Sequence, residues 1–340
     1  MLNRRKNIKA VALLSGGLDS ILAIQIILEQ GIDVIGVCFA LPYCSLDDNG
    51  KSIAEKIALK LGIEFRMETM GRDYLEIVKR PKYGHGTGMN PCIDCKIYML
   101  KRAKEIMEIE EAEFVITGEV LGQRPMSQHR IALNILERDS GMQGRLLRPL
   151  SAKHLPETIA EKEGLVDRSR LLGIKGRGRK EQIALAKEKG INIYIPAAGG
   201  CVLTDKFFTR KMKDILDHDE DIDWDDILIL NIGRHFRFGR SKIIVGRNEK
   251  ENTALSKMRK PGDYIFELPE EIPGPLTLLQ EEKSAKAIEL AAALTLRYSD
   301  LKQKNAVVMY GEYYKTNTIE ADVSVIDDTD FFNVSSGTKE

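Results

Sequence analysis

The sequence predicts an α/β protein in which a doubly wound parallel sheet is followed by a smaller α+β domain. In the N-terminal half, short apolar segments alternate with helix-patterned segments. Strands that are apolar on both faces are typical of a parallel sheet covered by helices on each side. Near residue 216 the composition changes, and seven acidic residues lie between Asp217 and Asp226. Beyond them, strand-like segments alternate with Gly and Asn turns, which favours a separate domain.

Each element of the predicted sheet can be read from its pattern. The first strand is the Val, Ala and Leu segment over residues 9–14, and Gly16-Gly17 separates it from an apolar helix over residues 19–30. The other strands of this sheet are expected over residues 33–41, 63–70 and 113–117, with a helix over residues 51–61 after the second strand. Right-handed crossovers bring the carboxyl ends of such strands to one edge, where these sheets bind ligands.

Composition excludes several classes of protein. Of the 340 residues, 43% are hydrophobic and 30% are charged, unlike a collagen, a coiled coil or a disordered chain. No apolar run reaches the roughly 18 to 20 residues of a membrane helix, and the N-terminus has no signal-peptide core. We therefore expect a cytoplasmic protein without a membrane partner. The 51 basic and 51 acidic residues balance, so a polyanionic partner would have to bind local basic patches.

A glycine-rich loop, Ser15-Gly16-Gly17-Leu18-Asp19-Ser20, lies between the first strand and the first helix. Two glycines allow the backbone to approach an anion closely, and the first N–H groups and the dipole of the helix attract negative charge. The loop has neither the lysine of a Walker motif nor the spacing of a dinucleotide fingerprint. It resembles the PP-loop of the ATP pyrophosphatase family, whose members cleave ATP between the α and β phosphates and transfer AMP to a carbonyl-type oxygen. The alternative is an ordinary helix start, in which Asp19 or Ser20 caps the helix.

The resemblance implies an adenine nucleotide α-hydrolase-like fold and a set of ATP-binding residues. These are Ser15, Gly16, Gly17, Asp19, Ser20 and, at the end of the fourth strand, Gly118. Asp19 is the candidate that would orient Mg²⁺ or its waters as charge builds on the leaving pyrophosphate. Gly118 would let the adenine or the ribose pack close to the backbone.

The chain has an odd and sparse set of cysteines, which argues against a secreted disulfide scaffold: Cys38, Cys44, Cys92, Cys95 and Cys201. Cys92 and Cys95 form a CxxC pair that follows Pro91 at the start of an expected helix. There the helix dipole would lower the pKa of the Cys92 thiol, and Cys95 falls on the same face. Cys201 follows a Gly-rich segment ahead of another expected helix. Cys38 is expected in the core, whereas Cys44 lies just past a strand end and its role is open.

Cys92, Cys95 and Cys201 together suit three kinds of chemistry. Three thiolates can hold a [4Fe–4S] cluster with one iron left open. Alternatively, Cys92 acts as a nucleophile with Cys201 as its resolving or persulfide-bearing partner. Structural zinc would need a fourth ligand, for which His85 is the nearest candidate. If the CxxC spacing is accidental and Cys201 is merely buried, none of these applies.

The order of a PP-loop followed by NPCxxC is similar to the tRNA 2-thiouridylases, in which a cysteine at the Cys92 position and one far downstream are required for sulfur transfer. Three cysteines near an ATP site also resemble the iron–sulfur-dependent tRNA thiolases. The likeness covers residues 5–215. It departs from the thiouridylases at Thr117-Gly118-Glu119, where Thr-Gly-His is usual, so a 4-thiouridine synthase-like role is equally tenable. The later segments GRHFR, IVGRNEKEN and PGP look like a small domain shared with ribosome-quality-control RNA-binding proteins.

The resemblance implies an ATP-dependent tRNA sulfurtransferase that adenylates a uridine carbonyl and replaces its oxygen with sulfur, after the nucleotide has been flipped into the site. Its catalytic residues would be Cys92, Cys201 and Asp19, and its metal ligands Cys92, Cys95 and Cys201. Its cofactors would be ATP and Mg²⁺, with a [4Fe–4S] cluster as the alternative to persulfide chemistry. Its partners would be tRNA and a sulfur donor, either a cysteine desulfurase or free sulfide.

The implied domains are a PP-loop ATP-binding domain over residues 1–165, a catalytic extension over residues 166–216 that carries Cys201, and a C-terminal domain over residues 217–340 that is a candidate for RNA binding. Residues 175–180 form a first basic stretch that could hold tRNA phosphates. A second combines Arg234, Arg237, Arg240, Lys242 and Arg247 with His235, Phe236 and Phe238, although a half-buried strand alternates in the same way. A polar loop beside Gly118 could contact ATP or the base: Gln123, Arg124, Ser127 and Gln128.

Two other functions fit part of the sequence. A PP-loop ligase that activates a small carboxylate would use the glycine-rich loop and leave the cysteines idle. A nucleotide-responsive RNA-binding adaptor without turnover would rest on the C-terminal basic residues. The tRNA dependence of pyrophosphate release and the effect of Cys92→Ala separate these functions from sulfur transfer.

Overall fold

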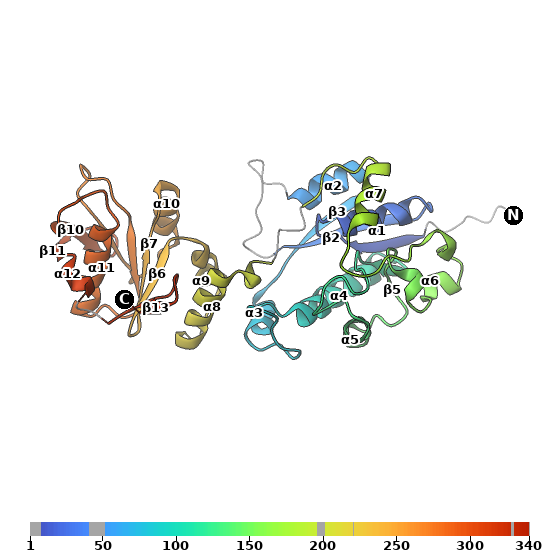
Figure 1. Ribbon diagram of the computed structural model, residues 1–340, viewed down its shortest axis with the longest axis horizontal. Helices are drawn as coiled ribbons and strands as arrows, with labels where there is room; N and C mark the ends of the chain where they lie inside the picture. Colours follow the sequence, from blue (N-terminus) through green and yellow to red (C-terminus); the bar gives the residue numbers. More distant parts are fainter. Residues whose placement is uncertain (1–7, 41–51, 196–200, 220, 328–329, 340) are drawn as a thin grey trace. The chain divides into compact units, whose positions relative to one another are not determined.

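The computed structural model describes residues 8–40, 52–195, 201–219, 221–327 and 330–339 (Figure 1). Contacts along the chain divide it into two compact units, Met1–Cys201 and Val202–Glu340. The predicted boundary after residue 216 lies later than this division, so helix α8, Lys206–His218, belongs to the second unit. Within the described residues, no helix combines the length and the apolar character that a membrane span requires.

A five-stranded sheet in the order β3-β2-β1-β4-β5 forms the centre of the first unit. Its strands are β1 (Lys9–Leu13), β2 (Asp33–Ala40), β3 (Glu64–Thr69), β4 (Phe114–Ile116) and β5 (Leu146–Leu147). All four neighbouring pairs are parallel. The predicted doubly wound α/β class is therefore confirmed, and β5 is a further strand that the sequence pattern did not indicate.

Helices cover both faces of this sheet. They are α1 (Leu18–Leu28), α2 (Ile53–Leu61), α3 (Arg72–Lys79), α4 (Cys92–Ile109), α5 (Arg130–Ser140), α6 (Ile159–Lys162) and α7 (Lys180–Glu188). Side chains alternate across β1, so Ala10 and Ala12 pack in a core with α1, α2 and α7, whereas Val11 packs in a second core with α4 and α5. Figure 1 shows these two groups of helices on opposite sides of the strands.

The second unit contains an eight-stranded sheet in the order β11-β10-β8-β9-β7-β6-β12-β13. Its strands are β6 (Arg234–Phe238), β7 (Ser241–Val245), β8 (Tyr264–Glu267), β9 (Thr277–Gln280), β10 (Asn305–Gly311), β11 (Asn317–Asp322), β12 (Phe332–Asn333) and β13 (Thr338–Lys339). Every pair in it is antiparallel. Helix α11 (Ala285–Arg297) packs its apolar side against one face of these strands, which confirms the predicted α+β character. The remaining helices are α8, α9 (Trp224–Leu228), α10 (Glu249–Met258) and α12 (Ser324–Asp327).

The acidic stretch that begins at Asp217 is part of the folded second unit. Asp223 caps α9 in a capping box with Asp226, and both carboxylates bind the Lys260 ammonium. These acids stabilise a helix start, where carboxylates interact favourably with the dipole. These described acidic residues therefore belong to the folded second unit.

Candidate active site

The strand order places a topological switch between β1 and β4. The chain leaves β1 towards β2 and β3 on one side, and returns to β4 and β5 on the other. Ligands of open α/β sheets bind beyond the carboxyl ends of the strands at such a point. The loop Ser15–Ser20 follows β1 and Gly118 follows β4, so both predicted groups of ATP-binding residues lie at this position.

The glycine-rich loop has the backbone of an anion-binding turn. Gly16 has a positive φ of 75°, which favours glycine. Ser20 Oγ donates a hydrogen bond to Gly17 O (2.7 Å), and Gly17 N–H donates to Ser15 Oγ (3.3 Å). Helix α1 begins after Gly17, and no side chain caps it. The simple capping role considered for Asp19 or Ser20 is therefore not observed, and the positive end of the helix dipole remains available to an anion.

Two side chains from elsewhere in the unit hold the Asp19 carboxylate. Its Oδ2 accepts hydrogen bonds from Gln123 Nε2 (2.7 Å) and from Arg179 Nη2 (3.0 Å). Gln123 is in turn held by the fully buried Gln182, whose Nε2 donates to Gln123 Oε1 (3.1 Å). Asp19 Oδ1 is buried and has no hydrogen-bond partner among the described residues. Such a buried carboxylate oxygen without a partner could bind Mg²⁺, or a water molecule bound to it, because Mg²⁺ prefers oxygen donors.

The structure gives a packing reason for glycine at position 118. A Cβ at this position would collide with the backbone of the first turn of α1, coming within 2.7 Å of Asp19 O and closer still to Ser20 N. Glycine is therefore required for the close approach of the β4 end to the PP-loop helix. The backbone of Asp19 and Ser20 occupies the direction that a Cβ would take, and the contact of Gly118 with adenine or ribose stays a prediction.

The next residue, Glu119, forms a buried ion-pair network. Its carboxylate binds Lys96 of α4 and also Arg148, whose Nε donates at 2.9 Å. Burial raises the pKa of Glu119, but the charges of Lys96 and Arg148 outweigh it and bring this pKa to about 2. The glutamate that replaces the usual histidine thus fixes Lys96, which directly follows Cys95 in the chain.

The CxxC pair starts α4, as predicted. Pro91 precedes the helix, and Cys92 is its first residue. Asn90 Nδ2 donates a hydrogen bond to Cys92 Sγ (3.0 Å), and Tyr74 OH donates one to Cys95 Sγ (3.3 Å). Both sulfur atoms are therefore oriented by a neighbouring donor.

Cys92 and Cys201 both act electrostatically on Cys95 in the first unit. Burial raises the pKa of Cys95 to about 12, the Tyr74 hydroxyl acts against this, and negative charge on Cys201 and Cys92 raises the pKa further. Cys201 thus influences Cys95, although it is more than 100 residues away in the chain. Cys201 is exposed, whereas Cys92 and Cys95 are partly buried.

The described residues form no preformed metal site around the thiols. Among the residues that the structure describes, no group of three or more His, Cys, Asp or Glu side chains is arranged to hold a metal ion. The nearest candidate for a fourth zinc ligand, His85, is hydrogen-bonded through Nε2 to Val78 O (2.7 Å). The described residues thus offer no preformed metal site, and a [4Fe–4S] cluster held by Cys92, Cys95 and Cys201 stays a prediction. Cys38 packs against the core of the unit from β2, and Cys44 lies outside the described residues.

One loop contacts both the PP-loop and the CxxC helix. Gln123 in this loop binds Asp19, and Met126 Sδ lies 3.9 Å from Asn90 Nδ2, the group that also donates to Cys92. A later segment also contacts the PP-loop: Ile195 forms a β-bridge with Gly17, and its N–H donates to Gly16 O (2.8 Å). The chain reaches Cys201 six residues later. The phosphate loop is therefore linked to Asn90, the partner of Cys92, through Gln123 and Met126, whereas residues 196–200 between Ile195 and Cys201 lie outside the described residues.

The two predicted basic stretches differ in exposure. In residues 175–180, Lys175, Arg177 and Lys180 are exposed, and the stretch is joined to the polar loop because Gly176 N–H donates to Leu121 O (2.7 Å). The second stretch is not a surface stripe. Arg237 is buried and paired with Asp214, and Lys242, His235 and Phe236 are buried as well. The alternation there arises from a strand with one face in the core.

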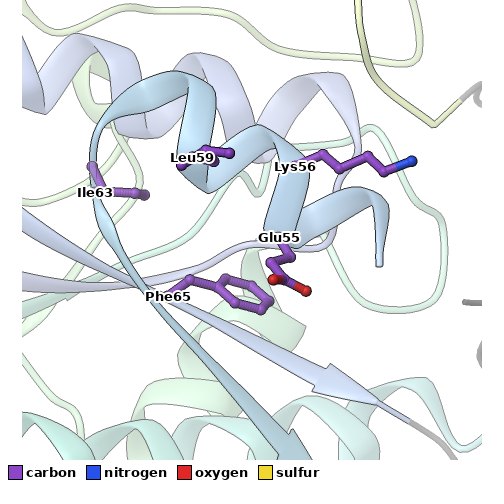
Figure 2. A pocket seen from close by; sticks show the side chains of 5 residues that line it. All are labelled: Glu55, Lys56, Leu59, Ile63 and Phe65. Atoms are coloured by element: carbon purple, nitrogen blue, oxygen red, sulfur yellow. The ribbon is translucent and has the colours of Figure 1, made fainter. Parts of the chain in front are cut away.

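A shallow pocket of ≈ 240 Å³ lies elsewhere, at the edge of the sheet between α2 and β3. Figure 2 shows its lining, which comprises Glu55, Lys56, Leu59, Ile63 and Phe65. It contains no cysteine and no PP-loop residue. We assign it no part in the site, which is defined by the contacts of Asp19, Cys92 and Cys95.

Comparisons with known proteins agree with this site. Residues 6–167 match the family described as thiamine biosynthesis protein (ThiI), and residues 233–333 match the family described as NFACT protein RNA binding domain. A probable tRNA sulfurtransferase of Methanothermobacter thermautotrophicus is 34% identical over 169 residues, which are 47% of this chain and 41% of that protein. A tRNA-specific 2-thiouridylase, MnmA 2 of Fusobacterium nucleatum subsp. nucleatum, is 33% identical over 116 residues, 32% of this chain and 33% of the relative. The chain thus spans less than half the length of these relatives.

Solved structures give more distant likenesses. A 4-thiouridine synthetase in complex with RNA and ATP has a TM-score of 0.40 and 22% identity, and the match covers 66% of this chain and 51% of that one. The U34-tRNA thiolase NcsA of Methanococcus maripaludis, with its [4Fe–4S] cluster, has a TM-score of 0.34 and 19% identity, covering 64% and 75%. In loop motif, parallel sheet and sequence, the N-terminal unit of this chain is therefore similar to the ThiI family and to proteins named as tRNA sulfurtransferases and tRNA-specific 2-thiouridylases.

Proposed function

We propose that the protein is an ATP-dependent tRNA sulfurtransferase that replaces a uridine carbonyl oxygen with sulfur. The observation that carries this proposal is the contact chain between the two halves of the site. Gln123 binds Asp19 of the PP-loop, and Met126 of the same loop lies against Asn90, the partner of Cys92. A nucleotide bound at the loop would therefore lie on the side of the sheet where the thiols gather.

The first step activates the base. The uridine oxygen attacks the α-phosphorus of ATP, the bond between the α-phosphorus and the bridging oxygen breaks, and pyrophosphate leaves with the electron pair. The uncapped start of α1 and the Ser15 and Ser20 hydroxyls would hold the phosphates. When bound, Mg²⁺ would offset the charge on the pyrophosphate, and Asp19 Oδ1 is its protein ligand.

The second step delivers sulfur. The exposed Cys201 thiolate takes the terminal sulfur from the persulfide of a cysteine desulfurase, whose own cysteine thiolate leaves, and so becomes a persulfide. Free sulfide would instead attack the adenylated carbon directly and expel AMP, which needs no oxidant. The terminal sulfur of the Cys201 persulfide attacks the adenylated carbon and expels AMP. The Cys92 thiolate then attacks the Cys201 sulfur, which releases the thiouridine and leaves a Cys92–Cys201 disulfide. A thiol reductant returns both cysteines to the reduced state with two electrons. Cys95 stays protonated at neutral pH because its pKa is about 12, so it orients the site and does not act as the nucleophile.

Binding of tRNA is assigned to two regions. Lys175, Arg177 and Lys180 are exposed next to the polar loop and would contact phosphates near the reacting base. The second unit matches an RNA-binding family and would supply further contacts. Because the reacting carbonyl is inaccessible in a stacked base, the nucleotide must be flipped into the site.

The test is thionucleoside formation. The full chain is incubated with unmodified tRNA, ATP, Mg²⁺ and a sulfur donor, and digested tRNA is analysed by mass spectrometry. Wild-type protein should form a thiouridine, Cys92→Ala and Cys201→Ala should form none while still binding ATP, and Cys38→Ala should remain active. Thiouridine formation by a variant that lacks all cysteines, or by Cys92→Ala, would overturn the proposal.

The same assay separates the rival functions. A ligase for small carboxylates would release pyrophosphate without tRNA, and an adaptor would release none and tolerate Cys92→Ala. Because no group of described side chains is arranged to hold a metal ion, the proposed reaction uses no iron–sulfur cluster. Iron and acid-labile sulfide in anaerobically purified protein measure that alternative directly, with near-stoichiometric iron contradicting the persulfide route.

A further inference from the structure

A polar pocket of ≈ 370 Å³ lies in the second unit, within the size range of small-ligand sites. Four separate segments form it: the start of β6, the turn between β7 and α10, the Pro273–Pro275 turn, and the residues after α11. Asn252 of α10 ties two of these walls together, since its Nδ2 donates to Gly274 O (3.4 Å). Gly246 leaves room for this side chain, because a Cβ there would meet Asn252 Oδ1. The pocket is thus built by packing across the fold.

Arg234 is held in this pocket without a polar partner. Its guanidinium lies over the ring of Tyr298, with 4.5 Å between the guanidinium carbon and the ring centroid. It makes no hydrogen bond or ion pair with any residue that the structure describes, so its donors are available. The second arginine, Arg247, differs because its Nε donates to Glu251 Oε1 (2.9 Å). Arg234 is therefore the cation of this pocket that is positioned by an aromatic ring and free to bind a ligand.

The pocket also offers hydrogen-bond acceptors. The carboxylates of Glu249 and Asp300 line it, and neither has a hydrogen bond from a described residue. Asn252 Oδ1 is buried and has no partner among the described residues. The charges of Arg234 and Arg247 are balanced by those of Glu249 and Asp300, so the pocket is not a purely cationic phosphate-binding site. It suits a flat group with donors and acceptors on its edge, as in a nucleobase.

We propose that this pocket binds an unpaired nucleotide of RNA, with its base stacked on the Arg234–Tyr298 pair and its polar edge facing Glu249 and Asp300. Unpaired bases are recognised on aromatic rings and guanidinium planes, whereas the bases in a duplex are already stacked. All of the residues involved lie in the segment that matches an RNA-binding family. The inference rests on the RNA substrate of the proposed function but not on its sulfur chemistry.

The experiment compares two arginines of one hairpin. Arg234→Met removes the guanidinium of the pocket, and Arg240→Met removes an exposed guanidinium at the β6–β7 turn, outside the pocket. Both full-length variants should unfold close to the wild-type temperature, since neither guanidinium has a hydrogen bond or ion pair with a described side chain and the methionine at position 234 can still pack on the Tyr298 ring. The probe is a fluorescein-labelled single-stranded RNA octamer, titrated by anisotropy without ATP or sulfur donor, so the result stays readable even when no thionucleoside forms.

We expect Arg234→Met to weaken binding of the single strand about tenfold and Arg240→Met to change it less than about twofold. The same sequence as a perfect duplex should bind both variants alike. The proposal would be overturned if both variants lowered the affinity for the single strand equally. It would also be overturned if Arg234→Met lowered the affinities for single strand and duplex by the same factor. AMP that displaces the octamer from wild-type protein but binds Arg234→Met poorly would show that the pocket takes free nucleotides, which contradicts an RNA source.

Discussion

The Arg179 guanidinium lies 3.0 Å from the Asp19 carboxylate, although 160 residues separate them in the chain. Arg179 is the residue that precedes α7, and Asp19 belongs to the first turn of α1. The pair therefore fixes the end of a basic stretch directly against the PP-loop. Without Arg179, Gln123 would be the one described side chain left to bind the Asp19 carboxylate.

Arg179→Met is thus expected to weaken ATP binding. The dissociation constant should rise at least about tenfold, which corresponds to about 1.4 kcal/mol. Arg177→Met is the matched control, because Arg177 is exposed in the same stretch and contacts no described side chain. Calorimetric titration with ATP and Mg²⁺ measures both. Equal affinities for the two variants would show that the ion pair has no part in nucleotide binding.

Gly118→Ala tests the contact between β4 and the PP-loop helix. The added methyl group meets the backbone of Asp19 and Ser20, which cannot move without displacing the loop, so overpacking should cost about 1–3 kcal/mol and abolish ATP binding. Gly178→Ala is the control, since a Cβ there has nothing within 4 Å. Thermal unfolding and ATP titration report the two effects. A Gly118→Ala protein that unfolds and binds ATP as wild type does would contradict the close approach.

Local patterns in the sequence predicted the elements that position the site. The β1, α1 and β2 segments form within one or two residues of their expected bounds, because buried strands and glycine breaks are local signals. The two-residue β5 could not be found in this way, since Leu146 and Leu147 are too few to show a period. The site depends on long-range pairs such as Arg179 with Asp19. In the sequence, Arg179 is one of four cations in six residues, and nothing local distinguishes it.

The second basic stretch shows why alternation misleads. Phe236 and Arg237 are both buried, one in the core and the other in an ion pair with Asp214, which lies on a different element. A sequence pattern shows which residues share a face but not what covers that face. Arg234 and Arg240 remain accessible because they lie at the two ends of the β6–β7 hairpin, a property of the pairing rather than of the residue type.

Cysteine reactivity should follow the environments of the three thiols. At pH 8 a thiol with a pKa of about 12 has about one ten-thousandth of its population as thiolate, and the thiolate is the reactive form. Iodoacetamide should therefore label the exposed Cys201 first and leave Cys95 unmodified. Tyr74→Phe removes a hydrogen bond that favours the Cys95 thiolate, so it should not increase labelling. Peptide mass mapping follows each site, and labelling of Cys95 as fast as Cys201 would refute its burial.

The stability of the second unit should rise between pH 8 and pH 10.5 because of Lys211. Its Nζ donates to Leu230 O (2.8 Å) and Gly233 O (3.3 Å), and burial, followed by the charge of Arg247, lowers its pKa from 10.5 to about 8. In this interval the unfolded chain binds more protons than the folded one, so the free energy of unfolding increases with pH, by up to about 3 kcal/mol. The single tryptophan of the chain, Trp224, lies in α9 of this unit, and its fluorescence reports urea unfolding there.

Lys211→Met supplies the comparison that isolates this group. Lys242 is also buried with a lowered pKa and changes stability in the same direction, so the wild-type slope alone does not assign the effect. Below pH 8 the variant no longer has to bury an ammonium group, whereas at higher pH it only loses the two hydrogen bonds to Leu230 and Gly233. Its unfolding free energy should therefore change less with pH than that of the wild type. Parallel pH profiles for the two proteins would mean that Lys211 reaches solvent and titrates normally.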